Sequence, residues 1–275
     1  MENLNQKTLW LRQKAKEIRR DILISLTEAG SGHTGGSLGL ADLFTVLYFH
    51  RMRYRANEPQ WGERDRLILS IGHVAPVLYT TLAHAGFFPK EELMTLRKLG
   101  SRLQGHPGRD HGLPGIELSA GSLGQGLSVG TGMALAARIR SQIHKVVVIL
   151  GDGELQEGSV WEAALSASHY KLDNLIAIVD RNGVQIDGET SEVMELEPLE
   201  EKWQAFGWST FHCNGNDIDK LISALDQGWI RSGKPVCILA NTIMGKGLPS
   251  IEGNHLWHGR APIQAELVDF LNELY

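Results

Sequence analysis

Two oxygen-bearing side chains stand at the ends of successive apolar runs in this sequence. Asp152 lies in a Gly-Asp-Gly turn that follows Val146–Leu150, and Asn182 follows Leu175–Asp180. Because the carboxyl ends of parallel strands meet at one edge of a sheet, these two side chains are expected to lie side by side. With the Val184 carbonyl they form an all-oxygen site that suits Mg²⁺ together with diphosphate oxygens and a water molecule. The sequence therefore predicts a site for Mg²⁺ and a diphosphate.

Each of these turns has a simpler interpretation when it stands alone. Gly-Asp-Gly often forms only a turn, and the pair Asn182-Gly183 is itself a good turn signal. The spacing between them, however, leaves room for one helix and one strand, as in a β-α-β unit. Two such turns, each following an apolar strand, favour a metal–diphosphate site over two unrelated turns.

Histidines beside glycines form the second informative pattern. His33, His73, His106 and His258 each lie next to a glycine in a predicted loop, and His255 lies three residues before the last of them. Imidazoles can donate hydrogen bonds to a diphosphate and polarise substrate hydroxyls and carbonyls near pH 7. A zinc site is disfavoured because the sequence has no HxxxH or HExxH pair. The other histidines are assigned ordinary packing or surface roles: His50, His84, His111, His144, His169 and His212.

A glycine-rich run, Gly121–Gly126, precedes the first of these strands. Its spacing is GxxGxG, which differs from the GxGxxG of dinucleotide-binding turns, and those turns follow a strand. The sequence also has no GxxxxGK(S/T) motif for a Walker-type nucleotide site. The run is therefore interpreted as a loop whose bare backbone lies against a flat ring of a ligand. The 31 glycines of the chain cluster here and at the other motifs, as expected where backbone approaches a ligand closely.

The composition is typical of one soluble α/β domain spanning residues 1–275. The chain is 42% hydrophobic and 21% charged, and its net charge of −5 provides no basic surface for nucleic acid. The polar N-terminus, and apolar runs that stay well short of ~18 residues, argue against a secretory signal and a membrane span. Cys213 and Cys237 lack CxxC spacing and are predicted to be buried thiols, which fits a reducing, cytoplasmic setting.

Apolar periodicity predicts alternating helices and strands. The expected strands are 67–70, 146–150, 175–180, 208–212 and 236–240. The expected helices are 6–29, 39–49, 73–85, 123–137, 157–169, 197–205, 217–228 and 262–273. Residues 87–120, rich in Gly, His and Pro, are expected to form long ordered loops. This alternation predicts an α/β fold with a parallel sheet flanked by helices.

The order of the motifs resembles that of transketolase. The shared motifs are Ser31–Gly39, Ser70–His73, Gly105–Gly108, Gly121–Gly126, Gly151–Gly153 with Glu157-Gly158, and Asp180–Gly188. The match covers nearly the whole chain, which looks like the N-terminal, diphosphate-binding domain of a thiamine-diphosphate enzyme, specifically the N-terminal subunit of a split transketolase. The resemblance implies the thiamine-diphosphate-binding fold. It also implies thiamine diphosphate and Mg²⁺ as cofactors, with Ca²⁺ or Mn²⁺ as substitutes for Mg²⁺.

The resemblance implies cofactor roles for matching residues. Asp152, Asn182 and Val184 correspond to the Mg²⁺ ligands, and Asn182 counts among the cofactor contacts as well. The remaining matches to cofactor contacts are His73 and Gly153 at the diphosphate, Gly121, Ser122 and Leu123 at the pyrimidine, and Ile186 at the thiazolium. Ser122 stands where many full-length relatives have proline.

The resemblance also implies roles near the substrate. His33 and His106 match histidines near the reacting carbonyl and the C1 hydroxyl of the donor sugar. His258, or alternatively His255, matches a contact to both diphosphate and substrate. Glu157 matches an interface carboxylate that communicates between active sites.

By this resemblance, the expected activity is transfer of a two-carbon ketol unit from a ketose phosphate to an aldose phosphate. The part of a full transketolase that lies beyond this match carries the activating glutamate, the aromatic residue that stacks on the pyrimidine and the arginines that grip sugar phosphate. The expected partner is therefore a C-terminal, pyrimidine-binding subunit, in an α₂β₂ assembly without which this chain is inactive. Pentose phosphates are the default substrates, and a specialised catabolic sugar is the alternative.

Three other interpretations stay open at this point. The α subunit of a 2-oxo-acid dehydrogenase shares the Gly-Asp-Gly…Asn pattern, although the several glycine–histidine motifs argue against it. Half of a 1-deoxyxylulose-phosphate-type synthase would need pyruvate as donor. A non-catalytic binding or regulatory module is the third, and retention of Asp152, Asn182 and the loop histidines argues against it.

Overall fold

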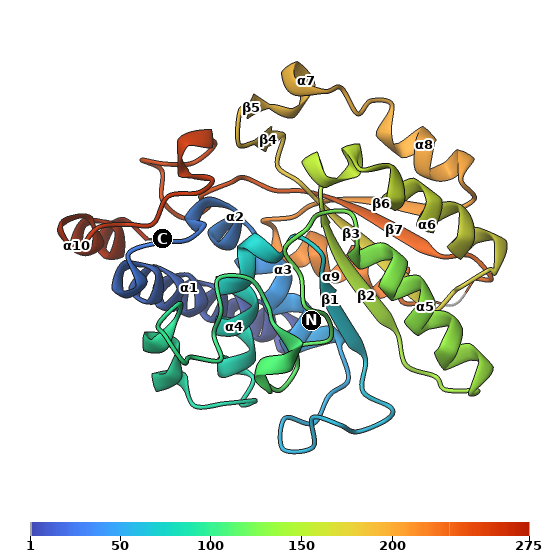
Figure 1. Ribbon diagram of the computed structural model, residues 1–275, viewed down its shortest axis with the longest axis horizontal. Coiled ribbons are helices and arrows are strands. Elements are labelled where there is room, and N and C mark those ends of the chain that lie inside the picture. The colour runs from blue at the N-terminus through green and yellow to red at the C-terminus, as the bar shows by residue number, and fades with distance from the viewer. Residues whose placement is uncertain (1, 231, 275) are drawn as a thin grey trace.

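A five-stranded parallel sheet forms the centre of the molecule (Figure 1). The computed structural model describes residues 2–230 and 232–274, with side chains described from residue 5 onward. Across the sheet the strands are β1 (Arg66–Leu69), β2 (Val146–Gly151), β3 (Leu175–Arg181), β7 (Val236–Asn241) and β6 (Ser209–Asn214). The predicted parallel sheet is thus confirmed, with strand bounds within about two residues of those expected.

Helices cover both faces of the sheet, because its central strands are apolar on both sides. On β2, Val147 and Ile149 join one hydrophobic cluster, whereas Val146, Val148 and Leu150 join the other. The first cluster is completed by α1 (Glu2–Ala29), α2 (Thr34–Gly39), α3 (Ala41–Val46), α4 (Ala75–His84) and α9 (Ile218–Gly228). The second is completed by α5 (Gly126–Ile139), α6 (Gly158–His169) and α8 (Leu199–Ala205). The result is a three-layer α/β/α arrangement.

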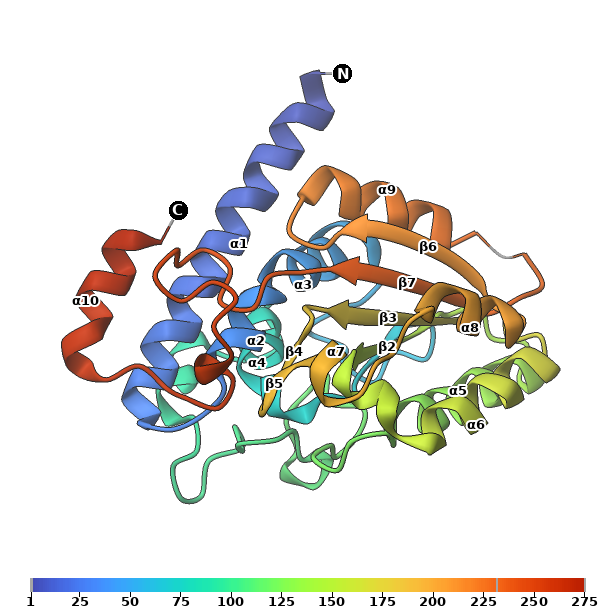
Figure 2. The ribbon, with the colours of Figure 1, turned by 90° about the horizontal axis from the view of Figure 1, so that it is seen from above.

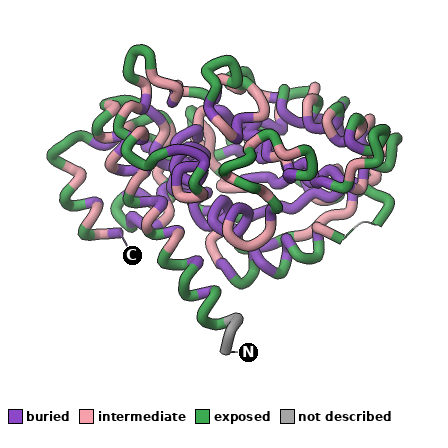
Figure 3. Tube along the Cα trace, turned by 90° about the horizontal axis from the view of Figure 1, so that it is seen from below, coloured by how far each residue is buried: buried purple, intermediate pink, exposed green. Residues whose placement is uncertain are grey.

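Helix α1 illustrates how the sequence pattern builds these layers. Leu11, Ile18, Ile22 and Leu26 are fully buried and recur at intervals of four or seven residues on one helical face. The helix ends where Gly30, at φ +64°, donates its backbone N–H to the Leu26 carbonyl, an arrangement that favours glycine. The N-terminal part of α1 extends away from the body (Figure 2), and much of its described surface is exposed (Figure 3). Helix α10 (Gln264–Glu273) packs beside α1.

Helix α2 begins earlier than the sequence predicts. The expected helix starts at residue 39, yet Thr34–Gly39 is already helical and buried throughout. Three of its six residues are glycine, which lowers helix propensity. Close packing decides the outcome: a Cβ on Gly35 would lie 2.5 Å from the Met244 side chain, and one on Gly39 would lie 2.9 Å from the Ile243 carbonyl.

Two further differences lie near the carboxyl edge of the sheet. Helix α5 starts at Gly126, three residues later than expected, because Gly124 adopts φ +81° and its N–H bonds to a buried carboxylate. A short antiparallel hairpin, β4 (Val184–Gln185) with β5 (Gly188–Glu189), and the helical turn α7 (Thr190–Val193) occupy a stretch for which the sequence analysis assigns no element. Shorter helical segments are Leu47–Arg51, Gly72–Val74, Lys90–Thr95, Arg109–His111, Gly153–Gln156 and His255–Trp257.

The strand register brings the functional turns together. Gly151 pairs with Asp180 across β2 and β3, and Arg181 pairs with Asn241 across β3 and β7. The carboxyl ends of these strands point toward the side of the molecule that holds α2 and the β4–β5 hairpin (Figure 2). The turns after β2 and β3 therefore share one edge of the sheet, as the sequence predicts.

The two cysteines are free and buried, as predicted from their spacing. Cys213 lies on β6 and Cys237 on β7. In the part of the chain that the structure describes, none of the helices combines the length and apolar character that crossing a membrane requires.

Candidate active site

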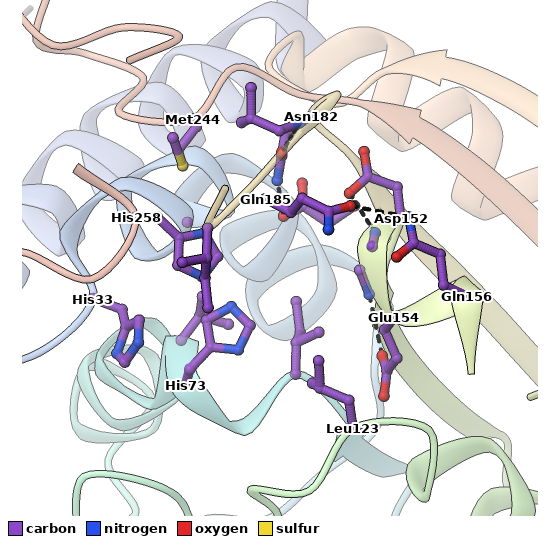
Figure 4. A pocket seen from close by; sticks show the side chains of 18 of the residues that line it. His33, His73, Leu123, Asp152, Glu154, Gln156, Asn182, Gln185, Met244 and His258 are labelled. Atoms are coloured by element: carbon purple, nitrogen blue, oxygen red, sulfur yellow. Dashed lines mark hydrogen bonds between the residues drawn. The ribbon is translucent and has the colours of Figure 1, made fainter. Parts of the chain in front are cut away.

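A cavity of about 460 Å³ opens at the carboxyl edge of the sheet (Figure 4). It is bounded by the start of α2, the turn after β1, the glycine loop before α5, the turn after β2, the β4–β5 hairpin and the segment around residue 258. The predicted site residues that line it are His33, His73, His106, Gly121, Leu123, Asp152, Gly153, Glu157, Asn182, Val184, Ile186 and His258. Residues from seven separate segments, the loop that carries His106 among them, thus meet in one space.

Two predicted residues lie outside this lining. Ser122 and His255 are exposed. Ser122 nevertheless lies between two residues that line the cavity, and His255 lies three residues before His258, which also lines it. Of the two alternative histidines in this region, the structure brings His258 into the cavity and leaves His255 on the surface.

Asp152 and Asn182 are held by backbone hydrogen bonds at the strand ends. Asp152 Oδ1 accepts from the N–H of Gly153 at 2.8 Å, and Oδ2 accepts from the N–H of Gly183 at 2.7 Å. The Asn182 side chain accepts from the N–H of Val184 at 3.0 Å and donates through Nδ2 to Asp180 at 3.0 Å. These bonds orient the Asn182 amide oxygen and still leave lone pairs on both side chains.

Burial makes negative charge unfavourable at this edge. It raises the pKa of Asp152 to about 6, although the amides of Gly183 and Gly153 act in the opposite direction. Burial raises the pKa of Asp180 to about 7, with hydrogen bonds from Thr242 and Asn182 lowering it and the charge of Asp152 raising it. A cation bound beside Asp152 would offset this cost by favouring the ionised carboxylate.

The available donors fit a hard divalent cation. In the described ranges, no group of three or more His, Cys, Asp or Glu side chains could hold a metal ion. The turns after β2 and β3 instead bring together the Asp152 carboxylate, the Asn182 amide oxygen and the segment that carries the Val184 carbonyl. Mg²⁺ commonly takes few protein oxygens and completes its octahedron with water and phosphate oxygens. The residues therefore fit Mg²⁺ only together with a phosphate-bearing ligand.

Four histidines line the cavity, and three of them, His33, His73 and His258, lie across it from Asp152 in Figure 4. The ring centroids of His33 and His73 are 5.0 Å apart, and those of His73 and His258 are also 5.0 Å apart. His33 lies 5.7 Å from His258 and 6.2 Å from His106, measured between ring centroids. Four loop histidines that are far apart in sequence therefore form one cluster.

These imidazoles are neutral at pH 7. Burial lowers the pKa of His73 to about 3 and that of His33 to about 4, and neighbouring histidines add to both shifts. Burial also lowers the pKa of His106 and of His258. A neutral imidazole can donate one hydrogen bond and accept another. Nδ1 of His33 is buried and has no hydrogen-bond partner among the described residues.

Glu154 is a cavity residue that the sequence analysis missed. Its carboxylate is buried and accepts hydrogen bonds from the N–H of Gly124 at 2.8 Å, the N–H of Gly151 at 3.2 Å and the Ser70 hydroxyl. The Ser70 oxygen in turn accepts from the N–H of Gly126 at 3.0 Å. Glu154 thus ties together the ends of β1 and β2 and the glycine loop. Its place two residues after Asp152 is the only signal the sequence offers.

Other lining residues were given no role of their own in the sequence analysis. Gln156 donates to the Gln185 side chain at 3.0 Å, which connects the turn after β2 to the hairpin. The rest of this set is Gly36, Ile71, Val74, Gly151, Asp180, Asp187 and Met244. Val74 and Met244 lie outside the shared motifs, and the fold brings them to the cavity beside the others.

The fold and this site define the class of protein. The parallel sheet with its helices is the α/β fold of thiamine-diphosphate-binding enzymes. Transketolase from Leishmania mexicana superposes with a TM-score of 0.89 at 33% sequence identity, over 94% of this chain and 40% of that chain. The chain thus spans less than half the length of that solved enzyme.

Sequence comparison gives the family. The family model described as "Transketolase, thiamine diphosphate binding domain" matches residues 12–275, so the chain belongs to the transketolase family, and the resemblance seen in the sequence is confirmed. It is 44% identical over 255 residues to the 6-deoxy-6-sulfo-D-fructose transketolase subunit SqwG of Clostridium sp. strain MSTE9, covering 93% of this chain and 92% of that protein. It is 40% identical over 264 residues to a subunit of the apulose-4-phosphate transketolase of Phocaeicola vulgatus, covering 96% of this chain and 93% of that protein.

Proposed function

We propose that the chain is the N-terminal subunit of a two-component transketolase. With a C-terminal partner it transfers a two-carbon ketol unit from a ketose phosphate to an aldose phosphate, using thiamine diphosphate and Mg²⁺. The observation that carries the proposal is the meeting of Asp152 and Asn182 with four neutral histidines in one cavity. Family membership and relatives that are named as transketolase subunits support it.

In this proposal one end of the cavity anchors the cofactor. Asp152, Asn182 and the Val184 carbonyl hold Mg²⁺, and Ca²⁺ or Mn²⁺ would meet the same oxygen donors. His73 donates a hydrogen bond to the diphosphate, and the backbone of Gly153 lies against it. The remaining assignments are Gly121, Ser122 and Leu123 at the pyrimidine and Ile186 against the thiazolium. The exposed position of Ser122 makes its assignment depend on contact made in the assembled enzyme.

The other end orients the sugar. When bound, thiamine diphosphate supplies a nucleophilic carbon that permits cleavage of the carbon–carbon bond beside a ketose carbonyl. The neutral rings of His33 and His106 donate hydrogen bonds to the carbonyl and C1 hydroxyl of the donor sugar, and they favour developing negative charge on oxygen. His258 contacts both diphosphate and substrate. Because His255 lies on the surface, we assign that role to His258.

Assembly and setting are further parts of the proposal. We assign residues 1–275 to one thiamine-diphosphate-binding domain and the pyrimidine-binding half to the partner subunit. Two copies of each chain would form an α₂β₂ heterotetramer in the cytoplasm, with Glu157 as the carboxylate that connects active sites. Relatives that are named as subunits support the two-component part of this proposal.

Pentose phosphates are the proposed substrates by default, which would place the enzyme in the pentose phosphate pathway. The relatives named for 6-deoxy-6-sulfo-D-fructose and apulose-4-phosphate make these two sugars the specific alternatives. A panel of xylulose 5-phosphate, fructose 6-phosphate and both alternatives as donors, with a common aldose phosphate acceptor, distinguishes them. The donor with the highest kcat/KM identifies the substrate class.

Calorimetry tests the function itself. Thiamine diphosphate and Mg²⁺ are titrated into the chain alone and into its mixture with the protein encoded beside it. We expect Mg²⁺-dependent binding, and ketol transfer only in the mixture. Ketol transfer by the isolated chain would refute the two-component proposal, and failure of Mg²⁺-dependent binding in both samples would remove the cofactor assignment. Decarboxylation of 2-oxo acids, or use of pyruvate as donor, would instead identify one of the two related enzyme classes.

A further inference from the structure

Arg97 has an unusual backbone conformation beside the histidine cluster. It follows the helical segment Lys90–Thr95 and adopts φ +61°, a left-handed value that is unfavourable for a residue with a side chain. Its backbone N–H donates to the Leu103 carbonyl at 2.8 Å, which closes the loop in this form. Such a conformation persists only where surrounding contacts hold it in place, and the Arg97 side chain makes such contacts.

The guanidinium of Arg97 lies between two histidine-bearing loops. A Cβ on Gly32 would lie 3.6 Å from Arg97 Nε, and a Cβ on Gly105 would lie 2.8 Å from Arg97 Cζ. Nη2 of Arg97 donates to the Gly105 carbonyl at 3.5 Å. Gly32 immediately precedes His33, and Gly105 immediately precedes His106. A side chain on Gly105 would collide with the guanidinium, so both loops approach this one cation closely.

The Arg97 charge acts on both rings. Among the described residues, no carboxylate lies within ion-pair distance of its half-buried guanidinium. The ring of His33 lies near the charge of Arg97 and near three other imidazoles, those of His73, His106 and His258. The ring of His106 lies near His33 and near the charge of Arg97.

The direction of each shift agrees with that geometry. Burial is the largest cause of the lowered pKa of His33 and of His106, and Arg97 lowers both further. The charge of Arg97 also affects Tyr79 on α4. Burial raises the pKa of Tyr79, and the positive charge of Arg97 acts in the opposite direction. The Tyr79 hydroxyl donates to the Gln104 carbonyl at 3.0 Å, on the same loop as His106.

We propose that Arg97 is a positioning residue that fixes the His33 and His106 loops relative to each other and places a positive charge beside both rings. The influence of Arg97 on ketol transfer rests on the proposed function. Its influence on the position and electrostatic surroundings of His33 and His106 does not. Both rings lie where a sugar carbonyl and hydroxyl would be held. Neutral rings backed by a nearby cation donate hydrogen bonds to oxygen that gains negative charge. Arg97 itself does not line the cavity and acts through the two histidines.

The test compares four versions of the full chain. Arg97→Gly removes the guanidinium and relieves the backbone strain, because glycine adopts φ +61° freely, so folding is not at risk. Arg97→Lys keeps the charge and serves as the conservative variant. Lys98→Met removes a positive charge from the next residue, whose exposed side chain pairs with Glu28 on α1, and is the matched control.

The first readout is the titration of His106, followed by NMR through its Cε1 proton and assigned with a His106→Asn variant. We expect its pKa to rise by about 0.5–1 unit in Arg97→Gly, because a neighbouring positive charge is lost. Arg97→Lys should restore most of the shift, and Lys98→Met should leave the titration unchanged. An unchanged His106 titration in Arg97→Gly, or an equal rise in Lys98→Met, would overturn the proposal.

The second readout is the pH profile of kcat/KM in the mixture with the partner subunit. We expect the acidic limb to move to higher pH in Arg97→Gly and to return toward wild type in Arg97→Lys, with the Kd for thiamine diphosphate unchanged within about twofold. A uniform loss of rate without a shifted limb would mean a structural role and would count against the proposal. If the wild-type mixture shows no ketol transfer, the proposed function fails, while the His106 titration still decides the role of Arg97.

Discussion

The carboxylate of Asp152 accepts a 2.7 Å hydrogen bond from the backbone N–H of Gly183, which lies 31 residues later in the chain. This bond joins the turn after β2 to the turn after β3. Asp152 is the only carboxylate among the proposed metal ligands. The bond orients it toward the segment that supplies the other two proposed ligands, Asn182 and the Val184 carbonyl. The metal site is therefore built across two strands, and its integrity depends on both turns.

Asp152→Asn is expected to abolish Mg²⁺-dependent binding of thiamine diphosphate. The substitution removes the site's carboxylate and places an amide N–H₂ against a backbone donor, either Gly153 or Gly183. Loss of a residue that only supports a metal ligand lowers metal affinity by about 10–100-fold. Because Asp152 is itself a proposed ligand, we expect the Kd for thiamine diphosphate to rise by about 100-fold or more. Calorimetry in the presence of Mg²⁺ measures the change, and EDTA added to the wild type should have the same effect.

The matched control for this variant is Asp269→Asn, which removes an exposed carboxylate from α10. Its Kd for the cofactor should equal that of the wild type. Equal affinity of Asp152→Asn and wild type would rule out Asp152 as a metal ligand.

Glu154→Ala is expected to destabilise the chain. It leaves the amides of Gly124 and Gly151 and the Ser70 hydroxyl without their acceptor in a buried region. Each unsatisfied buried donor costs about 1–3 kcal/mol, so the free energy of unfolding should fall by about 3 kcal/mol or more. Glu154→Gln keeps part of the acceptor capacity and should lose about 1–2 kcal/mol. Urea unfolding at pH 7 measures both.

Glu162→Gln on the exposed face of α6 controls for the loss of a carboxylate. Its free energy of unfolding should stay within about 0.5 kcal/mol of the wild type. If Glu154→Ala were no less stable than this control, Glu154 would not hold the three loops together.

The buried histidines should make stability depend on pH. The pKa of His73 is about 3 in the folded chain, well below the ordinary value of about 6.5, so below pH 6.5 the unfolded chain binds the extra proton. The contribution of His73 to the free energy of unfolding is therefore lost as the pH falls from about 6.5 toward 3. Asp152 and Asp180, whose pKa values are raised to about 6 and about 7, act in the opposite direction over the same range.

A comparison of variants isolates the histidine contribution. The free energy of unfolding of the cofactor-free chain should fall less steeply between pH 7 and pH 5 in His73→Asn than in the wild type. His169→Asn, on the exposed end of α6, is the matched control for replacing an imidazole. Parallel curves for His73→Asn and wild type would contradict the prediction.

Two glycines in α5 should respond oppositely to alanine. A Cβ on Gly130 would lie 2.5 Å from Cγ2 of the buried Val148, whereas one on Gly132 would meet nothing within 4 Å. Overpacking costs about 1–3 kcal/mol, so Gly130→Ala should lower the free energy of unfolding despite better helix propensity. Gly132→Ala should raise it by about 0.5–1 kcal/mol. Denaturant unfolding of both variants measures this, and the same sign of change for both would be inconsistent with the packing described.

The pattern of apolar residues determined much of the framework by itself. Short apolar runs rich in β-branched residues, such as Val146–Leu150, favour strands covered on both faces, and their alternation with helices predicts the parallel sheet before any contact is known. The turn residues after such strands then share one edge, because all parallel strands end there. That reasoning located Asp152 and Asn182 beside each other. The glycine neighbours of His33 and His106 likewise singled out loops that approach a ligand.

Tertiary structure alone decided the contacts that no periodicity encodes. The helical state of Thr34–Gly39 follows from close packing against Met244, which outweighs the low helix propensity of its glycines. Glu154 and Arg97 gain their importance from contacts that the fold creates, Glu154 with Gly124 and Arg97 with the loop of Gly32. The sequence marks Glu154 only by its place two residues after Asp152. Only the folded chain shows that His258 enters the cavity while His255, three residues earlier, faces the solvent. Local sequence determines which elements form, whereas long-range packing determines which side chains meet.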